Sequence, residues 1–153
     1  MLPETFHPII SSWFAETYGQ PTSVQAEAWP LIERGEHVLA LAPTGSGKTL
    51  TAFLSAISRF CTDGVMRYPA DKLSVLYVSP LKALNEDIKR NLLEPLAAIQ
   101  ERFEKEGVFF PPVRVETRSG DTPQSERRRL LIHPPSILAL TPESLAILLL
   151  NPK

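Results

Sequence analysis

The residues whose types and spacing point most directly to chemistry form the stretch Ala42-Pro43-Thr44-Gly45-Ser46-Gly47-Lys48-Thr49. It follows a short apolar run and precedes an amphipathic one, which predicts a strand, a glycine-rich loop and a helix in succession. Such a loop can turn backbone N–H groups around phosphate oxygens, and the helix N-terminus adds partial positive charge. Lys48 can then reach the β- and γ-phosphates of a nucleotide, and the Thr49 hydroxyl can ligate Mg²⁺. One position departs from the usual pattern, because Ala42 stands where a glycine normally opens the loop. The alternative is a glycine turn that binds nothing, but such a turn does not need Gly-Lys-Thr.

Three further turns each follow a predicted strand and open a predicted helix: Ser79-Pro80, Arg118-Ser119-Gly120-Asp121-Thr122-Pro123 and Thr141-Pro142. Ser and Thr are good helix N-caps, and Pro is favoured at the first helical position. Each turn should therefore present a helix N-terminus at the C-terminal edge of a parallel sheet, where N–H groups suit a phosphate backbone. Spacing alone favours ordinary helix capping. The run Arg127-Arg128-Arg129 fits either a nucleic-acid contact or, somewhat better, a solvated helix face.

The bulk composition narrows the class of protein. The chain has 153 residues, 43% of them hydrophobic, which suits one domain with its own core. A net charge of −1 provides no global basic field, so nucleic-acid contacts must come from local sites. The one cysteine, Cys61, allows no disulfide or zinc site within the chain, and we expect a buried, reduced thiol in a cytoplasmic protein. No signal peptide is visible, and the apolar segment 145–150 is too short to span a bilayer, so no membrane partner is expected.

Apolar periodicity and the prolines predict alternating strands and helices. The expected strands are His37–Leu41, Ser74–Val78, Val113–Thr117 and Ile137–Leu140. The expected helices are Pro8–Tyr18, Ser23–Arg34, the amphipathic run from Leu50 to Cys61, Pro80 to about Glu94, a charged helix to Glu106 after a break or restart at Pro95, Pro123 to about Leu131, and one opening at Pro142. A polar loop is expected at Thr62–Lys72. This alternation indicates an α/β fold with a parallel sheet and helices on both faces.

In this order, the motifs resemble those of superfamily 2 helicases. The segment from Phe14 to Gln25, with Tyr18-Gly19-Gln20-Pro21-Thr22-Ser23-Val24-Gln25, resembles the Q motif, and Ala42–Thr49 resembles motif I. Ser79-Pro80-Leu81-Lys82-Ala83-Leu84 with Asp87 resembles motif Ia, Arg118–Thr122 resembles motif Ib, and Thr141-Pro142-Glu143-Ser144-Leu145 resembles the next DNA-contact motif. Trp13-Phe14, Ser79–Leu84 with Asn91-Leu92, and Gly120-Asp121-Thr122-Pro123 point to the large helicase-related (Lhr) family. The resemblance covers essentially the whole chain.

The resemblance implies a P-loop NTPase (RecA-like) fold and an ATP-driven motor, with ATP and Mg²⁺ as cofactors, that moves along single-stranded DNA and unwinds duplexes or DNA–RNA hybrids. Gln25 would read the adenine edge, although a helix-surface glutamine is the alternative, and Phe14 or Tyr18 would pack on the base. Lys48 and Thr49 would be the catalytic residues and Thr49 the metal ligand. Nucleotide binding is implied for Tyr18, Gln25, Thr44, Gly45, Ser46, Gly47, Lys48 and Thr49. Contact with the nucleic-acid backbone is implied for Pro80, Leu81, Lys82, Gly120, Asp121, Thr141 and Pro142.

No strand in these residues is followed by an Asp-Glu-x-His type motif, which in such motors supplies the Mg²⁺-binding carboxylate and the water-activating acid. We therefore expect residues 1–153 to be the N-terminal portion of a first RecA-like domain, truncated before the acid-motif strand and lacking the second motor domain. The chain alone should not turn over ATP and should depend on the remainder of the helicase chain. The alternative is a non-hydrolysing nucleotide- or nucleic-acid-binding module. A small P-loop kinase would leave Gln25 unexplained.

The resemblance also implies a strand order. In the helicase domain that this chain resembles, later strands lie between the strand of motif I and the next strand in sequence. We therefore expect His37–Leu41 to stand apart from the group formed by Ser74–Val78, Val113–Thr117 and Ile137–Leu140. Strands without partners are costly, so the isolated chain should be marginally stable.

Overall fold

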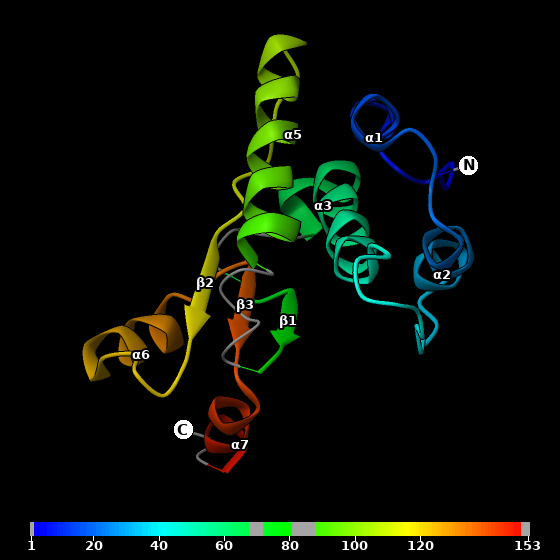
Figure 1. The fold of residues 1–153 in the computed structure, drawn as a ribbon. Helices are drawn as coiled ribbons and strands as arrows, with labels where there is room; N and C mark the ends of the chain where they lie inside the picture. Colours follow the sequence, from blue (N-terminus) through cyan, green and yellow to red (C-terminus); the bar gives the residue numbers. More distant parts are fainter. Residues whose placement is uncertain (1, 68–71, 81–87, 151–153) are drawn as a thin grey trace. The chain divides into compact units, whose positions relative to one another are not determined.

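The computed structural model describes residues 2–67, 72–80 and 88–150. They belong to two compact units (Figure 1). The helical unit comprises Met1–Asp63 and Arg90–Phe110, and the sheet unit comprises Gly64–Lys89 and Pro111–Lys153. The candidate nucleotide-binding residues lie in the helical unit. The described candidates for nucleic-acid contact lie in the sheet unit.

The helical unit is built from α1 (Pro8–Tyr18), α2 (Ser23–Glu33), the larger part of α3 (Lys48–Arg67) and α5 (Glu94–Lys105). The first two helices are each followed by a glycine with a positive φ, Gly19 and Gly35, a conformation that ends a helix at little steric cost. Their apolar faces meet those of α3 and α5 in one core, whose largest fully buried side chains are Ile10, Phe14, Trp29, Phe53, Leu54, Ile57, Leu92, Ile99 and Phe103.

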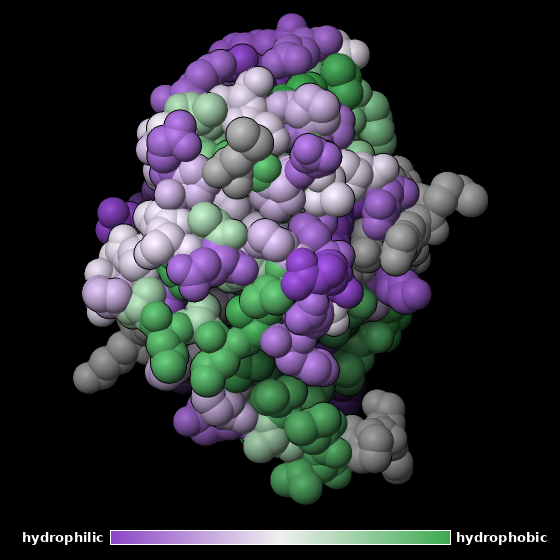
Figure 2. Space-filling view, turned by 90° about the vertical axis from the view of Figure 1, so that its right-hand side faces the viewer, coloured by the Kyte–Doolittle hydropathy of each residue, from purple (hydrophilic) through white to green (hydrophobic). Residues whose placement is uncertain are grey.

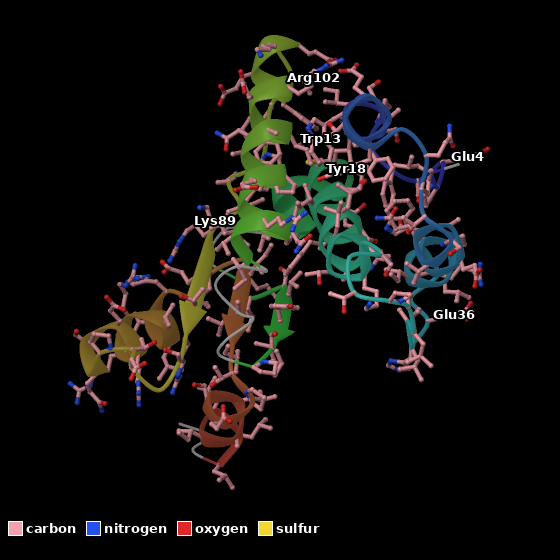
Figure 3. All side chains as sticks on the ribbon, in the orientation of Figure 1. Glu4, Trp13, Tyr18, Glu36, Lys89 and Arg102 are labelled. Carbon is pink, nitrogen blue, oxygen red and sulfur yellow. The ribbon has the colours of Figure 1, made fainter. Side chains whose placement is uncertain are left out.

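Helix α1 packs against α5. At the surface of this contact, the Arg102 guanidinium donates to both carboxylate oxygens of Glu16, at 2.7 and 2.8 Å (Figure 3). The hydrogen bond from Arg102 is the main reason that the pKa of Glu16 lies below its usual value. This two-point contact joins the two helices at the surface, and as an exposed ion pair it contributes little to stability.

A π-helical turn, η1 (Lys89–Leu93), leads directly into α5. Pro95 explains this wider turn, because it has no N–H for the carbonyl of Asn91 and its ring would clash with that carbonyl in a regular α-helix. Helix α5 begins at Glu94, with Pro95 in its first turn, and ends one residue before the predicted Glu106. The restart predicted at Pro95 is thus confirmed. Of the helix expected from Pro80 to Glu94, residues 81–87 lie outside the described residues.

The sheet unit contains three parallel strands, β1 (Val75–Val78), β2 (Val115–Arg118) and β3 (Ile137–Leu140), in the order β1-β3-β2. The central strand β3 is buried along its whole length, as a continuous apolar strand of a parallel sheet should be. Leu138 and Leu140, two residues apart and so on one face, pack with Leu130 of α6 (Gln124–Ile132) and Leu145 of α7 (Pro142–Leu150).

Helix α7 keeps an exposed apolar surface that includes Ile147, Leu149 and Leu150. Figure 2 shows hydrophobic side chains gathered at the bottom of the view, the level at which α7 lies in Figure 1. None of the helices in the described part of the chain combines the length and the apolar character needed to cross a membrane.

Two sequence predictions about elements are wrong. Residues 37–41 form no strand, because no described segment pairs with their backbone, and Leu39 and Leu41 are each 83% exposed. Helix α3 runs to Arg67 rather than giving way to a loop at Thr62, since each further residue of a formed helix adds a hydrogen bond and the Thr62 hydroxyl donates to the Ser58 carbonyl. The grouping of the other three strands is confirmed, with β2 beginning and ending slightly later than predicted. The described sheet does not include residues 37–41, as expected.

Candidate functional site

The loop before α3 has the backbone shape that surrounds a phosphate. Gly45 and Gly47 have φ values of 83° and 85°, in the left-handed region that favours glycine. The Ser46 N–H donates to the Pro43 carbonyl at 3.3 Å, and α3 begins at Lys48, so the loop delivers the chain into a helix N-terminus. Alternating left- and right-handed residues at such a position form an anion-binding concavity.

Two polar side chains of this loop are oriented toward its interior. The Lys48 ammonium donates to the Ala42 carbonyl and, at 2.8 Å, to the Pro43 carbonyl. The Ser46 hydroxyl is buried and has no hydrogen-bond partner among the described residues. A polyphosphate fits these residues, because its oxygens can satisfy the Ser46 hydroxyl and replace the carbonyls as partners of Lys48.

The first turn of α2 joins this loop through the predicted adenine-reading residue. Gln25 is only 3% exposed, and its Oε1 accepts from the Thr22 N–H at 3.0 Å. The Thr22 hydroxyl in turn donates to the Ser46 carbonyl at 2.9 Å. A side-chain carbon at Gly47 would lie 2.6 Å from Gln25 Nε2, so the carboxamide is packed directly against the loop. The alternative of a helix-surface glutamine is therefore wrong, and adenine recognition stays a prediction.

Of the two aromatic rings predicted to pack on the base of a nucleotide, one is part of the core. Phe14 is fully buried, and its ring meets Trp29 in an edge-on contact with centroids 5.4 Å apart. Tyr18 is 48% exposed and rests on Trp13 and Phe14, with centroids 5.7 and 5.1 Å away (Figure 3). Partial burial raises the pKa of Tyr18. A stacking role for Phe14 is thus excluded, whereas Tyr18 retains ring surface.

A pocket of about 350 Å³ lies beside the loop, between α2 and the extended segment 38–43. Its lining includes Ala28 and Leu31 from the helix and Leu39, Leu41 and Pro43 from the segment. This pocket was not predicted from the sequence, because α2 and the segment 38–43 form it together and neither carries a ligand motif.

In the sheet unit, the three strands end level with one another. Leu140 of β3 lies opposite Val78 of β1 and Arg118 of β2. Ser79, the residue that follows β1, donates its backbone N–H to the Leu140 carbonyl at 3.1 Å. The residues predicted to contact nucleic acid therefore leave the sheet at one edge, where Pro80, Gly120, Asp121 and Pro142 are exposed. The predicted contacts Leu81 and Lys82 lie outside the described residues.

Thr141, another predicted contact, has its hydroxyl engaged within the protein. The residue is buried, its Oγ1 lies 3.1 Å from the Ser144 hydroxyl, and it accepts from the Ser144 N–H at 3.4 Å. These are the contacts of a helix N-cap. The capping interpretation thus accounts for the side chain of Thr141, while the exposed Pro142 beside it leaves room for a ligand.

The arginines around the 119–122 turn have different surroundings. Arg127 donates from Nε to the Thr122 carbonyl at 2.8 Å and from Nη2 to the Gly120 carbonyl at 2.6 Å. Arg129 pairs with Glu116 at 3.1 Å, and Arg128 is exposed. Arg118 is only 6% exposed, and its Nε lacks a partner among the described residues. Burial, reinforced by Arg127, lowers the pKa of Arg118. The sequence pattern does not distinguish Arg127 from Arg128 and Arg129, because their contacts depend on the folded turn.

Cys61 lies on α3 and is half-buried, whereas a buried thiol was predicted. Burial raises the pKa of its thiol to about 12, which keeps it protonated and unreactive at neutral pH. Among the described residues, no group of three His, Cys, Asp or Glu side chains is placed to hold a metal ion. Thr49 therefore stands alone as the predicted metal ligand, in keeping with Mg²⁺ sites in which nucleotide phosphates and water supply most ligands.

The parallel sheet and the glycine-rich loop that opens α3 are the features of the P-loop class of fold. The family model for DEAD/DEAH box helicases matches residues 22–153. A Lhr helicase/probable uracil glycosylase of Mycolicibacterium smegmatis is 46% identical over 144 residues, which cover 94% of this chain and 9% of that protein. The ATP-dependent helicase Lhr-Core of Methanothermobacter thermautotrophicus is 49% identical over 150 residues, covering 96% and 17%. The chain therefore belongs to the Lhr family of DEAD/DEAH box helicases.

The solved structure of Mycobacterium smegmatis helicase Lhr bound to ssDNA and AMP-PNP matches with a TM-score of 0.84 and 44% identity. The match covers 97% of this chain and 18% of that one. A DUF1998 helicase, MrfA, bound to DNA matches with a TM-score of 0.68 at 23% identity, which supports the fold alone. The chain thus spans between 9% and 18% of the length of these relatives. The RecA-like fold predicted from the sequence is confirmed.

Proposed function

We propose that this chain is the ATP-binding and nucleic-acid-contacting part of an ATP-dependent DNA helicase or translocase. The observation that carries the proposal is the loop at residues 42–49. It has two left-handed glycines, an inward-turned lysine at the start of α3 and a buried Ser46 hydroxyl that has no hydrogen-bond partner among the described residues. A relative of the same family has been solved with a nucleotide analogue and single-stranded DNA, which supports the same ligand classes here.

At the nucleotide site, the proposed ligands of the phosphates are Thr44, Gly45, Ser46, Gly47 and Lys48. Thr49 at the start of α3 holds Mg²⁺, which neutralises phosphate charge during γ-phosphoryl transfer. Gln25 links the base to the loop, because it is packed against Gly47 while bonded to Thr22. Tyr18 offers its exposed ring to the base.

At the sheet edge, the proposed partner is the sugar-phosphate backbone of single-stranded DNA or of a DNA–RNA hybrid. The level ends of β1, β3 and β2 support this proposal, because each strand is followed by exposed turn residues: Pro80, Gly120, Asp121 and Pro142. Contacts to a backbone position the strand without reading its sequence, which suits a motor that moves along DNA.

Hydrolysis and unwinding require groups outside residues 1–153, so the remainder of a helicase chain is the proposed partner. The extended segment 37–41 supports this, because Leu39 and Leu41 are exposed and no described strand pairs with it. A strand from the remainder of the chain would satisfy the backbone of this segment and cover both leucines.

The test uses the full-length protein that carries this sequence. Lys48→Ala should abolish ATP hydrolysis and unwinding while leaving the affinity for single-stranded DNA within about twofold, since Lys48 faces nucleotide phosphates. Lys82→Ala should do the reverse and should lower the slope of log affinity against log salt by about one unit. Phosphate release and fluorescence anisotropy measure the two activities, and the exposed Lys72→Ala serves as the control. Equal loss of DNA binding in both variants would contradict the proposal.

A further inference from the structure

Arg127 of α6 is held by the backbone of a turn rather than by an acidic partner. Its Nε donates to the Thr122 carbonyl at 2.8 Å and its Nη2 to the Gly120 carbonyl at 2.6 Å. The same turn is closed from within by the Ser119 N–H, which donates to the Thr122 hydroxyl at 2.9 Å. One side chain thus fixes two of the carbonyls in a turn whose middle residues, Gly120 and Asp121, are exposed.

The orientation of the peptide between Gly120 and Asp121 follows from these contacts. In a planar trans peptide, the carbonyl and the following N–H point in opposite directions. Because the Gly120 carbonyl points to the Arg127 guanidinium, the Asp121 N–H must point away from Arg127. This N–H donates to no other group in the described part of the chain, so an exposed backbone donor faces outward at the sheet edge.

The other two arginines of the run provide a comparison. Arg129 is paired with Glu116, and Arg128 is exposed without a polar partner among the described residues. Arg118, the last residue of β2 before the turn, is buried, and burial together with the positive charge of Arg127 disfavours its charged form. Arg127 therefore does not neutralise an acid, and it does not stabilise the charge of Arg118. Its two hydrogen bonds to backbone carbonyls are what hold its side chain against the turn.

We propose that Arg127 is a positioning residue that aims the Asp121 N–H at a phosphate oxygen of the bound nucleic acid. The inference rests on the proposed function of the sheet edge. Arginine suits this task, because its rigid fork carries two donors at a fixed spacing, whereas the ammonium of lysine is a single point on a flexible stem. Arg127 acts through the turn and makes no contact with the phosphate.

The experiment compares Arg127→Ala, Arg127→Lys and the matched control Arg128→Ala in the full-length protein. The affinity for single-stranded DNA, measured by anisotropy across a salt series, should fall about tenfold for Arg127→Ala, because a hydrogen bond to a charged group is lost. Arg127→Lys should not restore it, and Arg128→Ala should change it less than about twofold. The salt slope should stay unchanged for Arg127→Ala, since a neutral N–H releases no counterion.

A contact between Arg127 itself and a phosphate would instead lower the salt slope by about one unit and would be largely rescued by lysine. That pattern overturns the proposal, as does wild-type affinity in Arg127→Ala. Loss of nucleotide affinity or of melting temperature in parallel with DNA affinity indicates general misfolding and also overturns it. Failure of the full-length wild-type protein to bind DNA would instead contradict the proposed function.

A second comparison tests the donor itself. Asp121→Pro removes the N–H, whereas Asp121→Ala keeps it and removes only the carboxylate. Asp121→Pro should lower DNA affinity as much as Arg127→Ala, and the double variant should lose no more than either single one, because both remove the same contact. Asp121→Ala should lose less DNA affinity than Asp121→Pro does, because it keeps the N–H that the proposal assigns to the phosphate. Additive losses in the double variant would show that Arg127 and the Asp121 N–H act independently.

Discussion

At the scale of single residues, the contact between Gln25 and Gly47 ties the first turn of α2 to the phosphate loop. Gln25 Nε2 occupies the space next to the Gly47 Cα, and its Oε1 is bonded to the Thr22 N–H. The side chain therefore cannot move aside without breaking its hydrogen bond to the Thr22 N–H. The shape of the phosphate loop therefore depends on Gln25, the residue that the sequence motif assigns to recognition of the base.

A glycine pair makes this dependence testable. Gly45 and Gly47 have nearly the same φ, so alanine at either position incurs similar backbone strain of about 1–2 kcal/mol. Only at Gly47 does the added carbon meet Gln25, since a carbon at Gly45 has no neighbour within 4 Å among the described residues. Gly47→Ala should therefore weaken nucleotide binding roughly tenfold more than Gly45→Ala does.

A fluorescent ATP analogue titrated into the full-length variants measures this difference. Gln25→Ala supplies the control, because it removes the side chain that the new methyl group would meet. In that background, the two alanine variants should bind the nucleotide with the same affinity. If the difference in nucleotide affinity between Gly47→Ala and Gly45→Ala stayed the same in that background, the contact with Gln25 would not be its cause.

At the scale of elements, the level strand ends and the caps that follow them form the candidate nucleic-acid edge. Helix α7 begins directly after β3, and Thr141 joins the two, since its backbone N–H approaches the Arg118 carbonyl while its side chain caps the helix. The same short segment therefore contributes to sheet pairing, helix initiation and the exposed edge at Pro142.

Substitutions at Thr141 can distinguish a capping role of its hydroxyl from contact with a ligand. Thr141→Ala should lower the free energy of unfolding by about 1 kcal/mol, because the Ser144 N–H loses its acceptor, and Thr141→Ser should retain it. Urea denaturation of the full-length protein, followed through the transition that includes this domain, measures the change. Unchanged stability together with weaker DNA binding in Thr141→Ala would mean that the hydroxyl serves the ligand rather than the helix.

At the scale of the whole molecule, the described surface exposes leucines that a finished core would cover. Leu39 and Leu41 are 83% exposed on the unpaired segment, and Leu149 and Leu150 are exposed on α7. Strands β1 and β2 are each paired on one side in the described sheet, which leaves two open edges. Exposed apolar surface and open strand edges promote association between chains.

The 153-residue polypeptide expressed alone should therefore melt broadly and aggregate at micromolar concentration. Circular dichroism during heating and light scattering after size-exclusion chromatography measure these properties. Leu39→Lys combined with Leu41→Lys should reduce aggregation, because charged residues protect an open edge. A sharp, reversible melt of a monomer would contradict this prediction.

The sequence by itself determined the local elements and the chemistry of the loop. Periodicity and capping residues located α1, α2, α6, α7 and the three strands of the sheet, because these signals depend on neighbours within a few residues. The spacing of Gly45, Gly47 and Lys48 indicated a phosphate site for the same reason. The strand predicted at 37–41 failed, since a strand needs a partner that a local pattern cannot supply.

Only the tertiary structure determines which of several side chains of the same type is buried, which is exposed and which forms hydrogen bonds. Phe14 and Tyr18 are both aromatic and four residues apart, yet one is buried against Trp29 and the other keeps exposed ring surface. Arg127, Arg128 and Arg129 are identical in type, and only the fold directs Arg127 to the carbonyls of Gly120 and Thr122. Such differences arise from contacts between segments that the folded chain brings together, and a local sequence pattern does not encode them.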